Sequence, residues 1–279
     1  MHNKTSISRV LSGLGVACIV TALAGCSAVQ TTGTGSVGVE RKQYMSGMVS
    51  EQALEQEAAQ QYATLVAQAK AQGALDADAA QTRRVQAITQ KLIQHVGTFR
   101  PDATNWKWET HVFSSDEVNA WCMPGGKIAV YTGLINKIKP TDAELAAVIG
   151  HEMAHALREH SREQVSQKMA TSVGLSVLSA VTGVGGAADL GSALSEVMFT
   201  LPNSRTHETE ADRIGVELAA RAGYDPRAAV TLWQKMGSLS AGSSPPEFLS
   251  THPSASSRSS DLTQAANKVM PLYQQAGGK

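Results

Sequence analysis

The run HEMAH at residues 151–155 constrains the fold more than any other feature, and it lies between the apolar runs AAVIG and AL. Positions four apart share one face of an α-helix, so the imidazoles of His151 and His155 can bind one Zn²⁺. Glu152 can then interact with a water bound to that ion. Polar groups in a helix with apolar flanks need partners, and a metal ion supplies them. The run therefore predicts a buried helix that carries two zinc ligands.

A catalytic zinc site takes three protein ligands and keeps a fourth position open. His160 is the first candidate for the third ligand, but it lies nine residues after His151. The pattern H-E-x-x-H-x-x-G-x-x-H needs ten, and Arg158 stands where its glycine would be. We therefore expect His160 to lie on the surface at the end of the helix. Glu208 and Asp212 are one helical turn apart, so one carboxylate can ligate zinc while the other hydrogen-bonds a ligand histidine.

Four motifs follow one another along the chain: NAWCMPGGKIAVYTG at 119–133, HEMAH at 151–155, ETEAD at 208–212 and THP at 251–253. Together they resemble the HtpX and CAAX-prenyl-protease superfamily of zinc metallopeptidases over roughly residues 50–270, and within it the short periplasmic lipoproteins. The resemblance implies an α+β, mostly helical fold of the gluzincin type. In such a fold a small mixed sheet packs on the H-E-x-x-H helix, and its edge strand receives the substrate peptide.

The same resemblance assigns roles to individual residues around one Zn²⁺ per chain. It implies that Glu208 is the third ligand, that Asp212 supports the site, and that His252 is a removable fourth ligand. Arg258 matches an arginine that can stabilise the developing oxyanion. The implied metal ligands are thus His151, His155, Glu208 and His252, and the implied catalytic residues are Glu152, Asp212 and Arg258.

The resemblance implies a zinc-dependent endopeptidase that acts on protein or peptide substrates, and we expect these to be misfolded or misassembled proteins of the bacterial envelope. Glu152 would take a proton from the attacking water and pass it to the leaving amine. A chaperone or assembly factor with the same fold and weak proteolysis is the alternative. The intact Glu152 favours the enzyme, because a degenerate site would be free to lose it. A non-proteolytic zinc hydrolase is a third and weaker interpretation.

The first 25 residues resemble the signal of a bacterial lipoprotein. Lys4 and Arg9 precede an apolar stretch that ends in the run LAGC, so Cys26 is expected to become a lipidated N-terminus after cleavage. In such lipoproteins the residue after the cysteine influences sorting, and Ser27 at this position resembles lipoproteins of the outer membrane. We expect residues 26–48 to be a flexible tether and residues 49–279 to be the metallopeptidase domain. The chain would then sit on the periplasmic face of the outer membrane, where outer-membrane assembly machinery is an expected partner.

Charge and cysteine content exclude other classes. Lys plus Arg and Asp plus Glu number 24 each, so the net charge is zero and the basic surface of a nucleic-acid-binding protein is not expected. The three cysteines are too few for a disulfide framework. Cys18 leaves with the signal and Cys26 carries lipid, so Cys122 remains alone, and we expect it to be a small buried hydrophobic residue.

Periodicity and turn signals outline the other elements. Helices are expected at 49–71, 77–96, 144–168 and 208–222. One more helix should end near 236, and a last one should begin near 257. A strand is expected at 106–113 and two short strands within 118–131. His111 is expected to be an ordinary polar residue of its strand. Residues 171–188 carry no charge and are rich in glycine. We expect them to form a lid or a mobile pair of short helices near the site, in preference to a membrane span.

Overall fold

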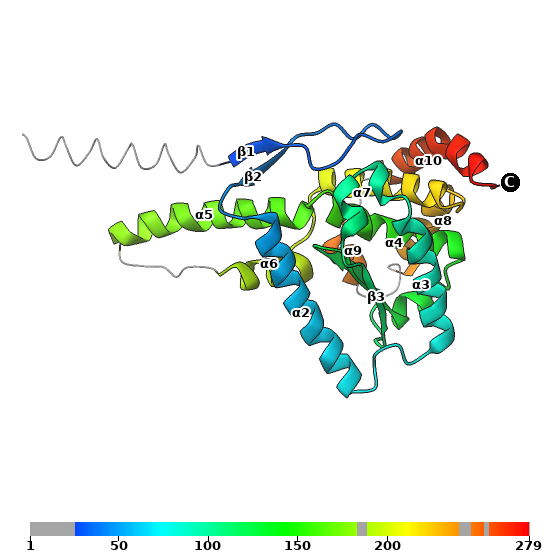
Figure 1. Ribbon diagram of the computed structural model, residues 1–279, viewed down its shortest axis with the longest axis horizontal. Helices are drawn as coiled ribbons and strands as arrows, with labels where there is room; N and C mark the ends of the chain where they lie inside the picture. Colours follow the sequence, from blue (N-terminus) through cyan, green and yellow to red (C-terminus); the bar gives the residue numbers. More distant parts are fainter. Residues whose placement is uncertain (1–25, 183–188, 240–246, 254–256, 279) are drawn as a thin grey trace, which may run out of the picture.

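The computed structural model describes residues 26–182, 189–239, 247–253 and 257–278, with the backbone alone described at 26 and 172–182. The strands of this part of the chain are β1 Cys26–Val29, β2 Gln43–Ser46, β3 Glu109–Phe113, β4 Ala120–Met123 and β5 Lys127–Tyr131. The α-helices make up most of the fold (Figure 1) and are α2 Glu51–Ala71, α3 Ala79–Ile93, α4 Asp142–Leu157, α5 His160–Thr182, α6 Leu190–Phe199, α7 Arg205–Arg221, α8 Ala228–Leu239, α9 Glu247–Thr251 and α10 Arg258–Gln275. Short turns of 3₁₀- or π-helix lie at Val96–Thr98, Pro101–Asn105 and Leu134–Ile138.

The central sheet is small and mixed, with the order β3-β5-β4. β3 runs parallel to β5, and β4 runs antiparallel to it and forms one edge. Successive side chains of a strand point to opposite faces, and both faces here are covered. Ala120 and Cys122 belong to the core around α3, α4 and α7, whereas Trp121 and Met123 belong to a second core with α2 and α6. The expected α+β, mostly helical fold with a small mixed sheet is confirmed.

Helix α4 begins at a capping box and packs on the sheet. The Thr141 hydroxyl accepts from the backbone N–H of Glu144 at 3.2 Å, and the Glu144 carboxylate accepts from the Thr141 N–H at 2.8 Å. These bonds satisfy two of the donors that a helix start leaves free. Every residue from Glu144 to Leu157 is buried, between β4 on one side and α7 on the other. The predicted buried helix is confirmed.

The expected single helix over 144–168 is instead two helices. α4 ends at Leu157, and α5 begins at His160 after a turn in which Glu159 adopts φ +53°. Positive φ is unfavourable for a side chain other than glycine, so neighbouring contacts must stabilise the turn. Arg100 and Arg162 each form an ion pair with Glu159 at 2.7 Å. The helix propensity of the segment could not reveal this break, because the partner Arg100 is remote in sequence.

Helices α4 and α7 approach each other closely at a pair of glycines. A Cβ built on Gly215 would lie 2.6 Å from the backbone nitrogen of His151, and one built on Gly150 would lie 2.9 Å from the carbonyl oxygen of Gly215. Both contacts are with backbone, which cannot move aside as a flexible side chain can. The absence of side chains at these two positions therefore sets the distance between α4 and α7.

We expect Gly215→Ala to push α7 away from α4 and to lower the free energy of unfolding by about 1–3 kcal/mol, the usual cost of overpacking a core. Gly237→Ala is the matched control, because Gly237 also lies in a helix and no atom comes within 4 Å of its added Cβ. Alanine favours a helix over glycine by up to about 1 kcal/mol, so this variant should be neutral or more stable. Urea denaturation of both variants measures the difference, and equal effects would contradict the close approach.

Residues 27–46, which we call the N-terminal segment, fold onto the domain and do not form the expected flexible tether. β1 and β2 pair antiparallel and lie along α5 (Figure 1). Val37 and Val39 are buried in the main core, and the Val37 N–H donates to Glu217 at 2.9 Å. The Ser, Thr and Gly content predicted flexibility, but these few apolar residues are enough to anchor the segment.

No helix in the described part of the chain is both long and apolar enough to cross a membrane. Helix α5 continues through Thr182, so the first part of the glycine-rich stretch 171–188 is one helix rather than a pair of short ones. The expected lid falls largely on residues 183–188 and on side chains that lie outside the described residues.

Candidate metal centre

Two histidines of α4 lie on one side of the site. His151 and His155 are one helical turn apart, and their Nε2 atoms lie 3.1 Å from each other. Their side chains are only 3% and 10% exposed. The predicted pairing of the two imidazoles on one face of the helix is confirmed.

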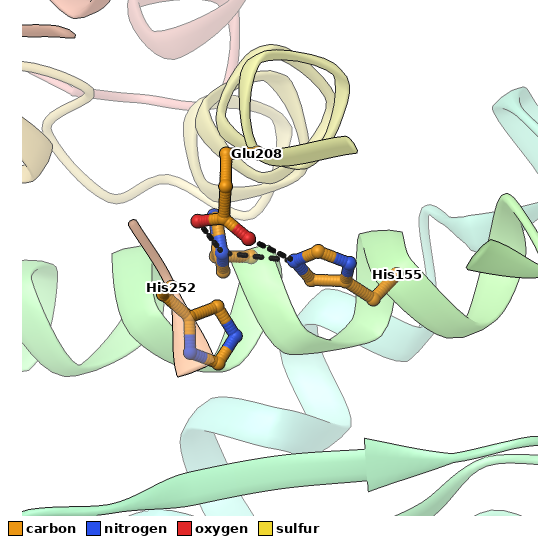
Figure 2. A group of neighbouring side chains, drawn as sticks. His155, Glu208 and His252 are labelled. Atoms are coloured by element: carbon orange, nitrogen blue, oxygen red, sulfur yellow. Dashed lines mark hydrogen bonds and ion pairs between the residues drawn. The ribbon is translucent and has the colours of Figure 1, made fainter. Parts of the chain in front are cut away.

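Glu208 reaches this pair from α7, as Figure 2 shows. Its Oε2 lies 3.5 Å from His151 Nε2, and its Oε1 lies 3.4 Å from His155 Nε2. Ser204 caps the start of α7 through the His207 N–H at 3.1 Å, which places Glu208 in the first turn of the helix. Of the two carboxylates left open by the spacing, Glu208 is the one that faces both imidazoles.

His252 completes the cluster from the residue that follows α9. Its ring stacks on Phe248, with centroids 4.2 Å apart, and its Nδ1 lies 3.0 Å from the Phe248 carbonyl oxygen. These contacts leave Nε2 directed toward the other side chains, where it lies 3.4 Å from Glu152 Oε1. One donor atom from each of His151, His155, Glu208 and His252 lies within 4.8 Å of all the others.

The donor set fits a zinc ion. Tetrahedral ligands at about 2.0–2.1 Å from zinc lie about 3.3 Å from one another. The two imidazole nitrogens are 3.1 Å apart, and each lies 3.4 or 3.5 Å from one oxygen of Glu208. Both carboxylate oxygens of Glu208 are buried and have no hydrogen-bond partner among the described residues. A buried carboxylate needs positively charged partners. Arg258 lies 3.2 Å from Oε2, and a metal ion would interact with both oxygens.

The charges of the site also favour a cation. Burial by itself would raise the pKa of Glu208, but the neighbouring imidazoles of His252, His151 and His155 hold it well below its usual range. Burial lowers the pKa of His155 to about 4, which leaves its ring neutral and able to ligate. At His151 the carboxylates of Asp212 and Glu208 outweigh burial and raise the pKa to about 9. A positive charge, whether a proton or a metal, is stabilised at this point.

Asp212 and Arg258 support the ligands from behind. Asp212 Oδ1 lies 3.0 Å from His151 Nδ1, although the ring N–H is not aligned for a full hydrogen bond. Arg258 donates to Asp212 at 2.7 Å, lies 3.2 Å from Glu208 Oε2, and stacks over Trp233. The structure thus places Arg258 against the carboxylates, behind the ligands, and not along the cleft in front of Glu152.

His160 does not lie on the surface, and this expectation was wrong. It is 1% exposed, its Nδ1 lies 2.9 Å from His155 Nδ1, and its Nε2 lies 3.0 Å from Glu210. Burial holds its pKa well below the usual range, so the ring is neutral. The turn at Glu159 causes the difference, because it redirects the chain and folds His160 back toward the site. Glu210, which the sequence left without a role, is its partner.

Glu152 lies beside the ligands without being one of them. Its Oε1 is buried and has no hydrogen-bond partner among the described residues. Burial raises its pKa to about 8, with His151 and Arg258 opposing that effect. A carboxylate in this environment has a strong tendency to take up a proton. Glu152 also lines the cleft, where its unpartnered Oε1 can face a water.

A cleft opens in front of these residues, along β4. A small cavity of about 40 Å³ includes Glu152, His155 and His252 in its lining. It adjoins a cavity of about 210 Å³ with which it shares Trp121 and His252, and which is bounded further by Tyr131, Phe199 and Glu247. Because β4 is an edge strand, its backbone is available to pair with an extended peptide.

Two further expectations from the sequence are confirmed. Cys122 is a buried free thiol in the core on β4, and burial raises its pKa. His111 lies on β3 away from the metal ligands, with its Nδ1 2.6 Å from Asp76 and its Nε2 3.2 Å from Glu109.

Comparison with known proteins agrees with this geometry. The family model for peptidase family M48 matches residues 79–266. The mitochondrial metalloendopeptidase OMA1 of Arabidopsis thaliana is 44% identical over 158 residues, which cover 57% of this chain and 31% of that protein. The OMA1 of Bos taurus is 37% identical over 200 residues, which cover 67% of this chain and 38% of that protein. The beta-barrel assembly-enhancing protease of Escherichia coli is 30% identical over 206 residues, which cover 70% of this chain and 41% of that protein. The chain matches about a third to two fifths of the length of these relatives.

Proposed function

This chain belongs to peptidase family M48, and from that membership we propose that it is a zinc-dependent endopeptidase. The observation that carries the proposal is the convergence of His151, His155 and Glu208 beside a base, Glu152, that is not a ligand. Three protein ligands with a fourth position that can open are typical of catalytic zinc, whereas structural sites are closed by four. Zinc-binding alone does not require a buried carboxylate at Glu152.

When bound, zinc supplies the Lewis-acid charge that makes water nucleophilic near neutral pH and polarises a peptide carbonyl. The residues of this chain do the rest. Glu152 accepts one proton from the attacking water as the new C–O bond forms. It then donates that proton to the leaving nitrogen as the C–N bond breaks, which regenerates the carboxylate. β4 would hold the substrate backbone in an extended conformation beside Glu152.

The proposal is tested by digestion of casein with the purified chain, with a zinc chelator and after re-addition of zinc. We expect cleavage that the chelator abolishes and zinc restores. If neither the zinc-loaded parent nor its His252→Ala variant cleaves the unfolded protein that it binds, the proposal is overturned and the chaperone or assembly factor is favoured.

We propose in addition that His252 closes the site in a resting state. Its Nε2 belongs to the four-atom donor cluster and lies close to Glu152, so it occupies the position that water and substrate need. Burial and the neighbouring histidines lower its pKa to about 3, which keeps its ring neutral and able to ligate.

If His252 closes the site, His252→Ala should raise the basal rate of peptide cleavage, while the other three ligands still hold zinc. Cleavage of a fluorogenic peptide, normalised to zinc content, measures the effect. Ser250→Ala is the control, because Ser250 is an exposed residue of α9 whose hydroxyl contacts Glu247, and it contributes no donor to the cluster. An unchanged or lower rate would show that His252 contacts substrate or merely packs on Phe248.

We also propose that the chain is lipid-anchored through Cys26 to the periplasmic face of the outer membrane, with misfolded or misassembled envelope proteins as substrates. The LAGC run supports this proposal, as does the relative named beta-barrel assembly-enhancing protease, with outer-membrane assembly machinery as a partner. Expression in a Gram-negative bacterium should place the parent chain in the outer-membrane fraction. Cys26→Ser should lose acylation and leave that fraction, and an unchanged distribution would contradict the anchor.

A further inference from the structure

We propose that the N-terminal segment is a supporting part of the metal site, through a chain of contacts in which Arg41 holds Glu210, Glu210 holds His160, and His160 holds the ring of His155. The inference rests on the proposed zinc site. It gives positioning roles to three side chains that are not among the four clustered donors. It also makes a segment expected to be a disposable linker necessary for tight metal binding.

The first link is the contact between two imidazoles. His155 presents Nε2 to the donor cluster, so its ring proton resides on Nδ1, which faces His160 Nδ1 at 2.9 Å. His160 Nδ1 must then be the acceptor, and its own proton resides on Nε2, which donates to Glu210 Oε2 at 3.0 Å. One neutral tautomer of His160 satisfies both contacts. Such a partner determines the orientation and tautomer of a ligand histidine.

The ring of His160 has little freedom to rotate. It stacks on His207 with centroids 4.3 Å apart and an interplanar angle of 10°. His207 Nε2 lies 3.1 Å from Glu163 Oε2. Stacking on one face and a polar contact at each nitrogen confine the ring to the plane that faces His155.

The last link leads to the N-terminal segment. Arg41 Nε donates to Glu210 Oε1 at 2.7 Å, and its two terminal nitrogens donate to Glu163 at 2.8 Å each. Arg158 donates to Glu210 at 3.1 Å and to the backbone carbonyl of Arg41 at 2.7 Å. Gln43, which follows on β2, donates to the Arg158 carbonyl at 2.5 Å. The carboxylate behind His160 is thus held in part by a segment that begins next to Cys26.

The two histidine ligands are therefore supported differently. His151 has a carboxylate, Asp212, directly behind its outer nitrogen, and both residues belong to the helices α4 and α7 that build the site. The carboxylate behind His155 is one imidazole further away, and its position depends on Arg41. A change at Arg41 is therefore expected to reach the metal through Glu210, His160 and the ring of His155.

The test measures the zinc dissociation constant of the full chain by competition with a chromogenic chelator, which needs no substrate. His160→Phe, which removes both polar contacts, is expected to weaken zinc binding by about 10–100-fold, the usual effect of losing a residue that supports a ligand. His160→Asn keeps an acceptor near the position of Nδ1 and should recover most of this loss. Arg41→Gln should weaken binding in the same direction by a smaller factor.

The control is His111→Phe, which removes a histidine with two carboxylate partners that are not ligands, and it should leave zinc affinity unchanged. Thermal denaturation in excess chelator separates a general loss of stability from a loss of metal affinity. A folded His160→Phe variant with a dissociation constant within about twofold of the parent would overturn the proposal. Unchanged affinity in Arg41→Gln, whose side chain is 31% exposed and should tolerate replacement, would overturn the role of the N-terminal segment. Failure of the parent to bind zinc would instead overturn the proposed function.

Discussion

Glu152→Gln is expected to lower the rate of peptide cleavage by about 10²–10⁴-fold, the usual contribution of general acid–base catalysis, while zinc content stays unchanged. Glutamine has nearly the size of glutamate, so the buried position beside His252 remains filled. The amide cannot accept a proton from water and return it to the leaving amine. Because Glu152 is not one of the four clustered donors, the metal should stay bound.

Peptide turnover and metal content by plasma mass spectrometry, measured on the same preparation, provide the comparison. Glu117→Gln is the matched control, because Glu117 lines the adjoining cavity but does not belong to the cavity that contains Glu152. It should change turnover by no more than a few-fold. Full activity in Glu152→Gln would remove the assignment of Glu152 as the base.

Glu208→Ala is expected to weaken zinc binding by more than 100-fold. Loss of a residue that only supports a ligand already lowers metal affinity by about 10–100-fold. The carboxylate is the only acidic member of the donor cluster, and it faces both imidazoles of α4. Its removal also leaves the buried Arg258 guanidinium without one of its two carboxylates. Stability should therefore fall together with metal affinity.

Chelator competition measures the affinity, and circular dichroism establishes that the variant is folded. Glu40→Ala, which removes an exposed carboxylate, is the control and should bind zinc as the parent does. Equal metal content in Glu208→Ala and the parent would exclude Glu208 from the site. A loss of zinc with a preserved fold would confirm that this carboxylate, and not Asp212, is the ligand.

Much of the helical structure was predictable because it depends on local chemistry. The helix expected from residue 144 begins two residues earlier, at Asp142, and helical periodicity identified α2, α3, α7 and α10. The end of α4 was not predictable, because the turn at Glu159 depends on an ion pair with the distant Arg100. The N-terminal segment was misjudged for a similar reason. Its composition indicates a linker, and only its contacts with α5, α7 and the core show that it is folded.

The candidate site likewise contains relations that the sequence predicts and relations that depend on the fold. The sequence by itself determined that His151 and His155 share a helix face, that Glu152 lies beside them, and that two carboxylates stand one turn apart on a second helix. Those relations follow from the repeat of 3.6 residues per turn. The close approach at Gly150 and Gly215 decided that Glu208 faces the two imidazoles while Asp212 lies behind His151. The fold also decided that His160 and Arg41 stand behind His155, because such contacts join elements whose distance no spacing along the chain encodes.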